Sequence, residues 1–263
     1  MKYFTDKRLD GFPLMNSPLT IVIICMVYFL VAKIWGPKLM EKRQAFELRG
    51  VLVAYNSYQI IFNGFLFYQT CRLTWFSGYS LFCQPVNYSD TGEPFQILMI
   101  GYFFYVSKFV DFLDTLFFIL RKKNDQITFL HLYHHAITPI SVGPCVRFVG
   151  GGHSSFHVTC NTFVHFVMYI YYLMSSMGPN FRKFLWWKKY LTTLQMVQFI
   201  CVGLHSFQLM FIDCGFPKAY AWWTATQMFV FFLLFTDFYS GAYKRNKKGA
   251  PAGSTPIDLK KML

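Results

Sequence analysis

The chain has 263 residues, of which 54% are hydrophobic, 21% aromatic and only 14% charged. Soluble domains carry roughly 25% charged residues, so this composition excludes an ordinary soluble protein and is typical of an integral membrane protein. The net charge of +13 would suit nucleic-acid binding, but the Lys and Arg residues gather at the ends of apolar runs, so we expect no nucleic-acid partner.

Apolar runs long enough to cross a bilayer as helices predict six clear spans. A further span at about 127–148 is less apolar, and Pro139 and Pro144 within it should shorten or kink the helix. The predicted fold is therefore an all-α integral membrane protein, with one seven-helix domain over residues 1–243 and a flexible basic tail over 244–263. The clear spans lie at about 18–35, 51–75, 95–120, 155–176, 190–212 and 219–243.

The distribution of basic residues predicts the orientation. Lys and Arg are frequent after the first, third, fifth and seventh spans, whereas the loops on the opposite side hold few, such as Arg147 and Lys218. The positive-inside rule then places the N-terminus outside or in the lumen and the C-terminus in the cytosol. Basic and non-basic loops alternate between the two sides only if the less apolar segment at about 127–148 also crosses the membrane. The first span has a long apolar core and no Ala-x-Ala-like site after it, so we expect an anchor and not a signal peptide.

Two of the cysteines lie in predicted lumenal loops, where disulfides are allowed. We expect Cys83 and Cys214 to pair, and the cysteines within spans to be small buried hydrophobic residues. Asn87 begins the glycosylation sequon Asn-Tyr-Ser in the same loop as Cys83, close to the membrane.

Charged residues interrupt the third span. Lys108, Asp111 and Thr115 share one helix face, with Asp114 at its margin. Opposite charges one helical turn apart neutralise each other, which lowers the cost of burying them. They are either a structural ion pair that orients the helices or part of a site, since intramembrane charges mark both.

Residues 128–135, Thr-Phe-Leu-His-Leu-Tyr-His-His, are the most informative stretch of the chain. His131, His134 and His135 fall within an arc of roughly 100° on one helix face. Imidazole can ligate a metal, shuttle a proton or attack a carbonyl. Three histidines together inside an apolar segment are hard to explain as packing, so they predict a functional site.

A second polar stripe lies on the span at 155–176. It cannot face lipid, so it should face the interior of the bundle, as should the histidine cluster. Two histidine-bearing faces that meet inside one bundle predict a site between them. The stripe and its lateral tyrosines are His157, Asn161, His165, Met168, Tyr169, Tyr171 and Tyr172.

The next span adds Gln195 and Gln198, which interhelical hydrogen bonding would explain. A basic rim lies at the predicted cytosolic ends of the spans, beside two tryptophans. Positive-inside charge and an aromatic belt explain most of it. The same rim can also form a mouth that captures an anionic substrate by its phosphates. Its residues are Arg121, Lys122, Lys123, Lys188 and Lys189.

Several functions compete for these residues. Membrane di-iron desaturases and hydroxylases use boxes such as HxxHH, but they generally need about eight ligands, and this chain has only seven histidines, in a different arrangement. Cys160 precedes Asn161, and Cys/His/Asn groups catalyse acyl transfer, but Cys160 lies about 100° away from the polar stripe. The number of spans also allows a seven-helix receptor or transporter, in which three adjacent histidines would be unusual.

The motifs, taken in order, resemble the very-long-chain fatty acid elongase family, and the match covers nearly the whole chain. One position departs from the family, which usually has Glu where this chain has Asp111; the charge is kept, the reach is one methylene shorter, and the partner of the carboxylate is left open. The matching motifs are Lys108…Asp111-Phe-x-Asp114-Thr115, His131-Leu-Tyr-His134-His135, Asn161-x-x-x-His165-x-x-Met168-Tyr169-x-Tyr171-Tyr172 and Thr192-x-x-Gln195-x-x-Gln198.

The resemblance implies a 3-oxoacyl-CoA synthase of microsomal fatty acid elongation. Such an acyltransferase joins a long-chain acyl-CoA to malonyl-CoA, giving a 3-oxoacyl-CoA two carbons longer, carbon dioxide and free CoA. The family fold is seven helices, six of which enclose a narrow acyl tunnel while the first lies outside. The resemblance implies no metal and no redox cofactor. Its implied partners are the lipid bilayer and the ketoreductase, dehydratase and enoyl reductase of the elongation cycle.

The same resemblance assigns roles to residues. His134 would be the nucleophile, forming an acyl-imidazole intermediate. His165, Asn161, His131 and His135 would orient the thioester, promote decarboxylation of the malonyl group and stabilise the enolate. The remaining polar residues of the stripes and the basic rim would bind the substrates. In this family, His at the position of His131 tends to accompany saturated or monounsaturated substrates.

The last residues fit a cytosolic retrieval signal. Lys260 and Lys261 stand at positions −4 and −3 from the end, as in a dilysine motif, and such signals are read by receptors. Together with a lumenal N-terminus, they predict a multi-pass protein of the endoplasmic reticulum membrane. The oligomeric state is not readable from the sequence, and a homo-oligomer stays open.

Overall fold

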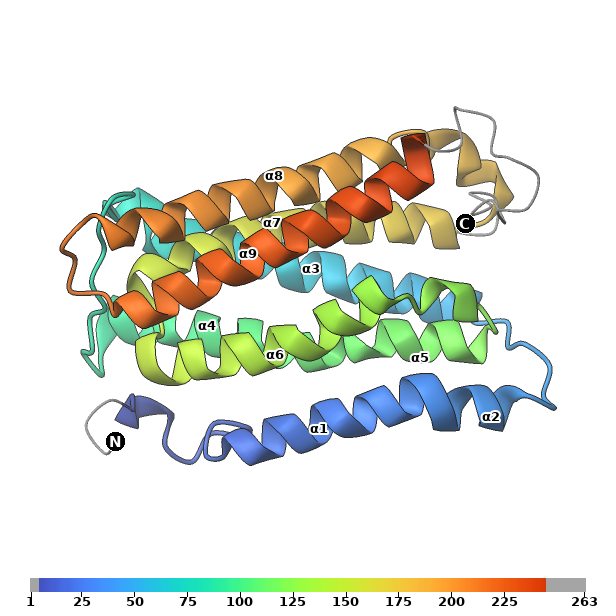
Figure 1. The fold of residues 1–263 in the computed structure, drawn as a ribbon, viewed down its shortest axis with the longest axis horizontal. Coiled ribbons are helices and arrows are strands. Elements are labelled where there is room, and N and C mark those ends of the chain that lie inside the picture. The colour runs from blue at the N-terminus through green and yellow to red at the C-terminus, as the bar shows by residue number, and fades with distance from the viewer. Residues whose placement is uncertain (1–4, 245–263) are drawn as a thin grey trace.

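The computed structural model describes residues 5–244, and every regular element in that range is a helix. The long helices lie side by side along the length of the molecule (Figure 1). The first is α1 (Pro18–Leu30), which continues through a π-helical turn (Val31–Trp35) into α2 (Gly36–Met40). The others are α3 (Arg49–Leu73), α4 (Gly92–Val110), α5 (Phe112–Leu120), α6 (Phe129–Val149), α7 (Ser155–Ser176), α8 (Lys188–Phe207) and α9 (Lys218–Tyr239).

Each predicted span coincides with a helical segment, with two differences in detail. The segment over 92–120 is interrupted at Asp111, where α4 ends and α5 begins. Helix α6 continues through Pro139 and Pro144, so the prolines do not shorten this span, and a kink, the other expected outcome, stays a prediction. Each proline removes one backbone donor. Val142 and Val146 are buried against neighbouring helices on the same turns, and this packing holds the segment together.

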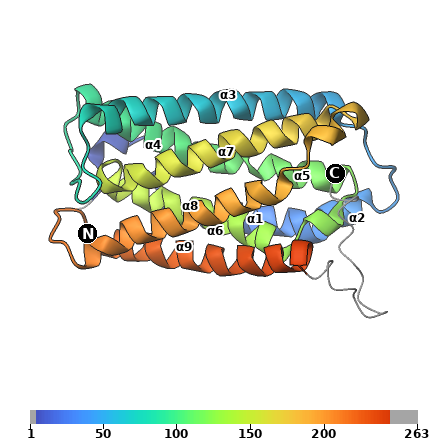
Figure 2. The same ribbon diagram turned by 90° about the horizontal axis from the view of Figure 1, so that it is seen from above.

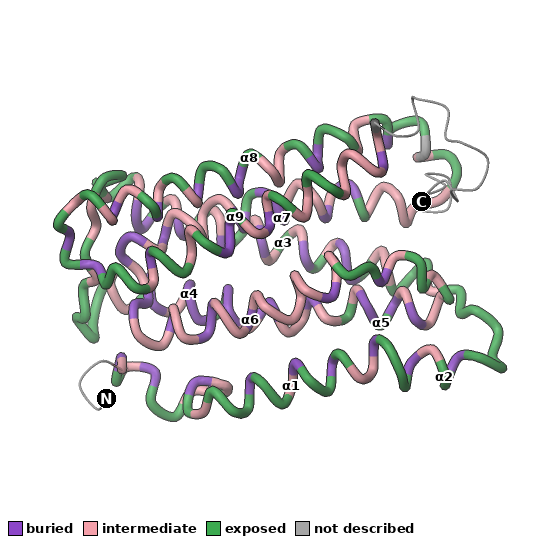
Figure 3. The backbone as a smooth tube through the Cα atoms, viewed as in Figure 1, coloured by how far each residue is buried: buried purple, intermediate pink, exposed green. Residues whose placement is uncertain are grey.

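Hydropathy alone singles out two segments of the described chain as long and apolar enough to cross a membrane, Pro18–Met40 and Lys218–Tyr243. Other helices carry buried polar side chains that lower their mean hydropathy, such as Asn56 and Gln59 on α3. The outward faces are apolar nevertheless: Ile61, for example, is 73% exposed. Exposed residues lie along the outside of the helices and buried ones toward their neighbours (Figure 3). Such a surface suits lipid as its surroundings.

The helices form neighbouring pairs. Helix α3 packs along α7, and α8 packs along α9 (Figures 1 and 2). Helix α1 lies on the outside of the assembly, against α6 and alongside α5 (Figure 1). The connections after α2, α5 and α7 gather at one end of the molecule, and those after α3, α6 and α8 at the other. This sorting matches the two sides that the basic residues predict.

The end that holds the connections after α3, α6 and α8 is held by covalent and ionic contacts. Cys83 and Cys214 form a disulfide, as expected, with a Cα–Cα distance of 5.6 Å. It joins the segment after α3 to the segment before α9. At the same end, Arg147 donates to the Asp10 carboxylate at 2.6 Å. Asn87 is exposed, and its Oδ1 accepts from the backbone N–H of Ser89 at 3.0 Å. Its glycosylation stays a prediction.

Candidate active site

The histidine cluster occupies the first two turns of α6. The Oγ1 atom of Thr128 caps this helix by accepting from the backbone N–H of His131 at 3.2 Å. The ring centroids of His131 and His135 are 4.3 Å apart, and those of His134 and His135 are 5.5 Å apart. The side chains one helical turn apart therefore lie together on one face, as the spacing predicts.

A wide cavity of about 320 Å³ separates this cluster from the polar stripe on α7. Its wall includes residues of α3, α5, α6, α7, α8 and α9, so it lies inside the helix assembly. Most of the residues that the sequence singles out meet there. Those in the wall are Asp111, Asp114, Arg121, Lys123, His131, His134, His135, Asn161, His165, Met168, Tyr169, Tyr171, Tyr172, Lys188, Gln195 and Gln198.

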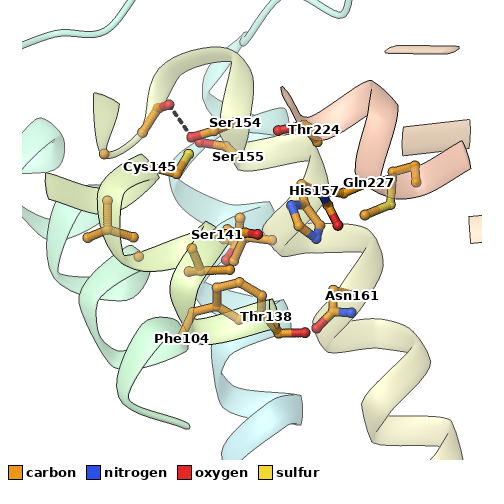
Figure 4. A pocket seen from close by; sticks show the side chains of 18 of the residues that line it. Phe104, Thr138, Ser141, Cys145, Ser154, Ser155, His157, Asn161, Thr224 and Gln227 are labelled. Atoms are coloured by element: carbon orange, nitrogen blue, oxygen red, sulfur yellow. Dashed lines mark hydrogen bonds between the residues drawn. The ribbon is translucent and has the colours of Figure 1, made fainter. Parts of the chain in front are cut away.

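A narrow cavity of about 70 Å³ continues toward the disulfide-bonded end of the molecule (Figure 4). Its wall mixes Phe104 and other apolar side chains with polar ones, among them Ser141, Ser155 and His157. The hydroxyls of Ser141 and Ser155 are buried and have no hydrogen-bond partner among residues 5–244. His157 lies in this narrow cavity and not in the wide one.

The two cavities share wall residues, which identifies where they meet. His134, Asn161, Gln198 and Phe199 line both. His134 therefore stands at the junction between a wide, polar space and a narrow one. Figure 4 shows Ser154 and Ser155 at one end of the narrow cavity and Asn161 farther along α7. A long, thin molecule that entered through the wide cavity would place its middle beside His134.

The Asp111 carboxylate has three partners inside the protein. Its Oδ1 accepts from Gln59 Nε2 at 2.8 Å and lies 3.3 Å from the Tyr169 hydroxyl, whose one proton is shared with Asp114, and its Oδ2 lies 3.5 Å from Lys108 Nζ. The same lysine donates to Asn161 Oδ1 at 3.1 Å. The sequence left the partner of the Asp111 carboxylate open, and the structure shows that Gln59 of α3 is one of its partners.

Lys108 does not line either cavity, but it contacts two residues that do, Asp111 and Asn161. The side chains of Lys108 and Asp111 are 2% and 5% exposed, so each charge needs the other. Because Asn161 Oδ1 accepts from Lys108, its Nδ2 group is left as the donor of a side chain that lines both cavities, as His134 and Gln198 do. The ion pair thus orients a residue of the cavity wall, which unites the structural and the functional readings of this motif.

Sequence reasoning missed the contribution of α3. Tyr55 and Gln59 bond to each other and to Tyr169, which in turn donates to Asp114 Oδ2 at 3.0 Å. Asn56 lines the wide cavity. A signal was present, since Asn56, Gln59 and Asn63 recur at helical spacing within an apolar run and so share one face.

The open end of the wide cavity is basic. Arg121, Lys123 and Lys188 contribute to its wall, from the end of α5 and the start of α8. Burial lowers the pKa of the Arg121 guanidinium from its ordinary value, but an arginine stays charged in proteins. Lys122 and Lys189 do not line the cavity: the first donates to the Glu41 carbonyl at 3.1 Å, and the second lies over the Tyr190 ring.

Two further groups of interest lie away from both cavities. The His205 ring stacks on that of His153 at 3.9 Å between centroids, and the His205 backbone carbonyl lies 2.8 Å from His153 Nε2. Cys160 packs among apolar side chains of α8 and α9. Within residues 5–244, no three His, Cys, Asp or Glu side chains come together as a metal site.

Comparison with known proteins fits this geometry. The model of the ELO, or GNS1/SUR4, family matches residues 13–251, which include both cavities. The chain belongs to the ELO family. A very long chain fatty acid elongase of Aedes aegypti is 46% identical over 97% of this chain and 71% of its own length. Very long chain fatty acid elongase 7 of Drosophila melanogaster is 47% identical over 93% of this chain and 75% of its own.

Similarity within the ELO family extends to vertebrates. Human very long chain fatty acid elongase 1 is 38% identical over 92% of this chain and 88% of its own length. The identity therefore spans the helices that supply the cavity walls. Most of the residues on which the resemblance to the family depends line the wide cavity.

Proposed function

We propose that this member of the ELO family condenses a long-chain acyl-CoA with malonyl-CoA to give a 3-oxoacyl-CoA two carbons longer. One observation carries the proposal: His134 stands where a wide polar cavity with a basic mouth meets a narrow, largely apolar one. A thioester bound with its CoA in the wide cavity and its tail in the narrow one has its carbonyl carbon beside this imidazole. The names of the relatives support the same reaction.

In the first half-reaction, a ring nitrogen of His134 attacks the thioester carbonyl. A C–N bond forms, the C–S bond breaks, and CoA leaves as the thiolate, which takes up a proton. The acyl-imidazole that results stays reactive toward carbon nucleophiles. Asn161 Nδ2, held by Lys108, would donate to the carbonyl oxygen as negative charge develops on it.

In the second half-reaction, malonyl-CoA binds in the place that CoA has left. Loss of carbon dioxide leaves an enolate, whose carbon attacks the acyl carbon. The C–C bond forms, the C–N bond breaks, and the leaving imidazole takes up a proton from solvent in the wide cavity, which restores His134. His165, His131 and His135 stand around the same space and would stabilise the enolate and orient the thioesters. None of these steps requires a metal or a redox cofactor.

The narrow cavity has room for only part of a long tail. Its volume is about 70 Å³, against about 320 Å³ for the wide cavity. Side chains in its wall, such as Phe104 and Phe231, therefore have to move when a longer acyl chain enters. The far end of this cavity, between α4 and α6, would set the preferred chain length.

The proposal includes the setting of the enzyme. Seven spans, with the first outside a ring of six, would place the disulfide-bonded end in the lumen of the endoplasmic reticulum and the basic mouth in the cytosol. The predicted retrieval signal at Lys260 and Lys261 lies outside the described residues. The 3-oxo product would pass to a ketoreductase, a dehydratase and an enoyl reductase.

The purified protein tests the function directly. It should convert saturated or monounsaturated long-chain acyl-CoA and radiolabelled malonyl-CoA into 3-oxoacyl-CoA, and omission of malonyl-CoA should abolish product. A panel of CoA esters would define the chain length. Absence of any malonyl-CoA-dependent product across the panel would overturn the proposal, and tightly bound iron with oxygen-dependent desaturation would favour the di-iron reading instead.

The basic mouth makes a prediction of its own. Lys188→Gln should raise the KM for acyl-CoA about fivefold, the equivalent of about 1 kcal/mol, and leave kcat unchanged, because a contact to the CoA phosphates acts equally before and during the reaction. The effect should shrink as salt is added. Lys189→Gln is the matched control, because Lys189 does not line the cavity. Equal KM values in the two variants would contradict a CoA-binding mouth.

A further inference from the structure

Helix α1 lies outside the assembly, yet one of its side chains reaches the histidine cluster through a chain of hydrogen bonds. The Tyr28 hydroxyl lies 2.8 Å from Thr115 Oγ1 on α5, and Thr115 Oγ1 lies 2.7 Å from His131 Nε2 on α6. Tyr28 is 7% exposed and Thr115 is 1% exposed. Water cannot compete for groups buried this deeply, so the order of donors in this chain has chemical consequences.

The direction of the chain follows from counting protons. A threonine hydroxyl has one proton to donate, and a tyrosine hydroxyl likewise. If His131 Nε2–H donated to Thr115, one hydroxyl proton would be left without an acceptor. Either Thr115 donates to Tyr28 and the Tyr28 proton is unpaired, or Thr115 accepts from both neighbours and its own proton is unpaired, since the described residues offer these two hydroxyls no other bond. A buried donor without an acceptor loses its hydrogen bonds to water and gains none in the protein, which destabilises the folded state. In the opposite order, Tyr28 donates to Thr115, Thr115 donates to His131 Nε2, and every proton is used.

Packing keeps Tyr28 in this position. Its ring stacks on Phe112 at 4.1 Å between centroids, and it lies 6.3 Å from the His135 ring. One turn earlier, the thiol of Cys25 donates to the Ala136 carbonyl at 3.5 Å. Helix α1 is therefore attached to α6 at the level of the histidines, and the phenol has little freedom to turn away.

We infer that Tyr28, acting through Thr115, holds His131 as the neutral tautomer that carries its proton on Nδ1. Nε2 accepts from Thr115, so Nδ1–H is the only polar group that this ring can offer within the wide cavity. A ring nitrogen that carries its proton donates and cannot accept. His131 then stabilises a negatively charged oxygen, on the acyl adduct or on the enolate, and does not act as the general base. This inference rests on the proposed function of the same site.

The tautomer can be observed without any assay of activity. Nitrogen-15 NMR of protein labelled at histidine distinguishes the two neutral tautomers by the shifts of the two ring nitrogens. The signals of His131 are those that a His131→Gln variant loses. The wild type should show the Nδ1–H form, and Tyr28→Phe should show a mixture of both forms. Signals of the Nε2–H form in the wild type would overturn the inference, whatever the protein catalyses.

Kinetics give the second readout. Tyr28→Phe keeps the ring but removes the donor, so kcat for elongation should fall about tenfold while KM for acyl-CoA stays unchanged. The kcat of Thr115→Val should fall at least as far, and Thr115→Ser should retain most of the wild-type kcat. Adding Tyr28→Phe to Thr115→Val should cost nothing more, because both act through one chain. Tyr58→Phe on the exposed face of α3 is the matched control and should leave kcat unchanged.

The two possible failures are separable. A wild type that elongates acyl-CoA normally, with a Tyr28→Phe variant of equal kcat, would refute the role of Tyr28 and leave the proposed function intact. A wild type that forms no malonyl-CoA-dependent product would refute the proposed function, and the NMR signals of His131 would still decide which tautomer the chain of hydrogen bonds selects.

Discussion

His134→Ala should abolish the release of free CoA from acyl-CoA in the absence of malonyl-CoA. Wild-type protein mixed with acyl-CoA alone should release up to one CoA per active site, because the acyl group is transferred to His134 and stays bound there in the absence of malonyl-CoA. The variant lacks the nucleophile, and its elongation rate should fall at least about a thousandfold, as is common when a covalent catalyst is removed. Thiol release and mass spectrometry of the acylated protein measure the two effects.

His205 supplies a matched control for this prediction. It is also a histidine on a helix, but it lines neither cavity and stacks on Phe156 and His153. His205→Phe keeps an aromatic ring in the stack and should release CoA as the wild type does. If His134→Ala condensed at a near wild-type rate, the acyl-imidazole would be ruled out, although another group in the cavity could still carry the reaction.

Lys108→Met should destabilise the protein strongly, because it leaves the Asp111 carboxylate buried without a cation. Breaking a buried ion pair by removing one partner costs about 3–5 kcal/mol. For a chain of this size, the thermal midpoint should fall by roughly 10 °C. Gln59 would still donate to the carboxylate, so the loss should come mainly from the missing charge. Thermal unfolding in detergent measures it.

The double variant Lys108→Met with Asp111→Asn separates charge from shape. Both groups are then neutral, and Asn keeps an acceptor for Gln59, so the midpoint should return most of the way to that of the wild type. Activity should not return, because Asn161 Oδ1 has lost its donor and its amide is free to turn. A Lys108→Met protein as stable as the wild type, or a double variant less stable than the single one, would contradict this account.

The sequence by itself determined the helices and most of the site. Helices are local structures, and their apolar and polar residues recur at a spacing that shows which face is buried. His131, His134 and His135 had to share one face, and the polar stripe that contains Asn161 and His165 had to point away from lipid. Both faces were therefore expected to point into the interior of the bundle, because polar side chains are unfavourable against lipid. The pairing of Cys83 with Cys214 was predicted because both lie in loops on the predicted lumenal side.

Only the tertiary structure decided which side chain meets which. Helix spacing says nothing about the register between two helices, so neither the bond from Gln59 to Asp111 nor the one from Tyr28 to Thr115 was readable beforehand. The same holds for the narrowing of the cavity at His134, which depends on how closely α6, α7 and α9 approach. The prolines of α6 show the limit of local rules, since packing along the helix outweighed the loss of two backbone donors.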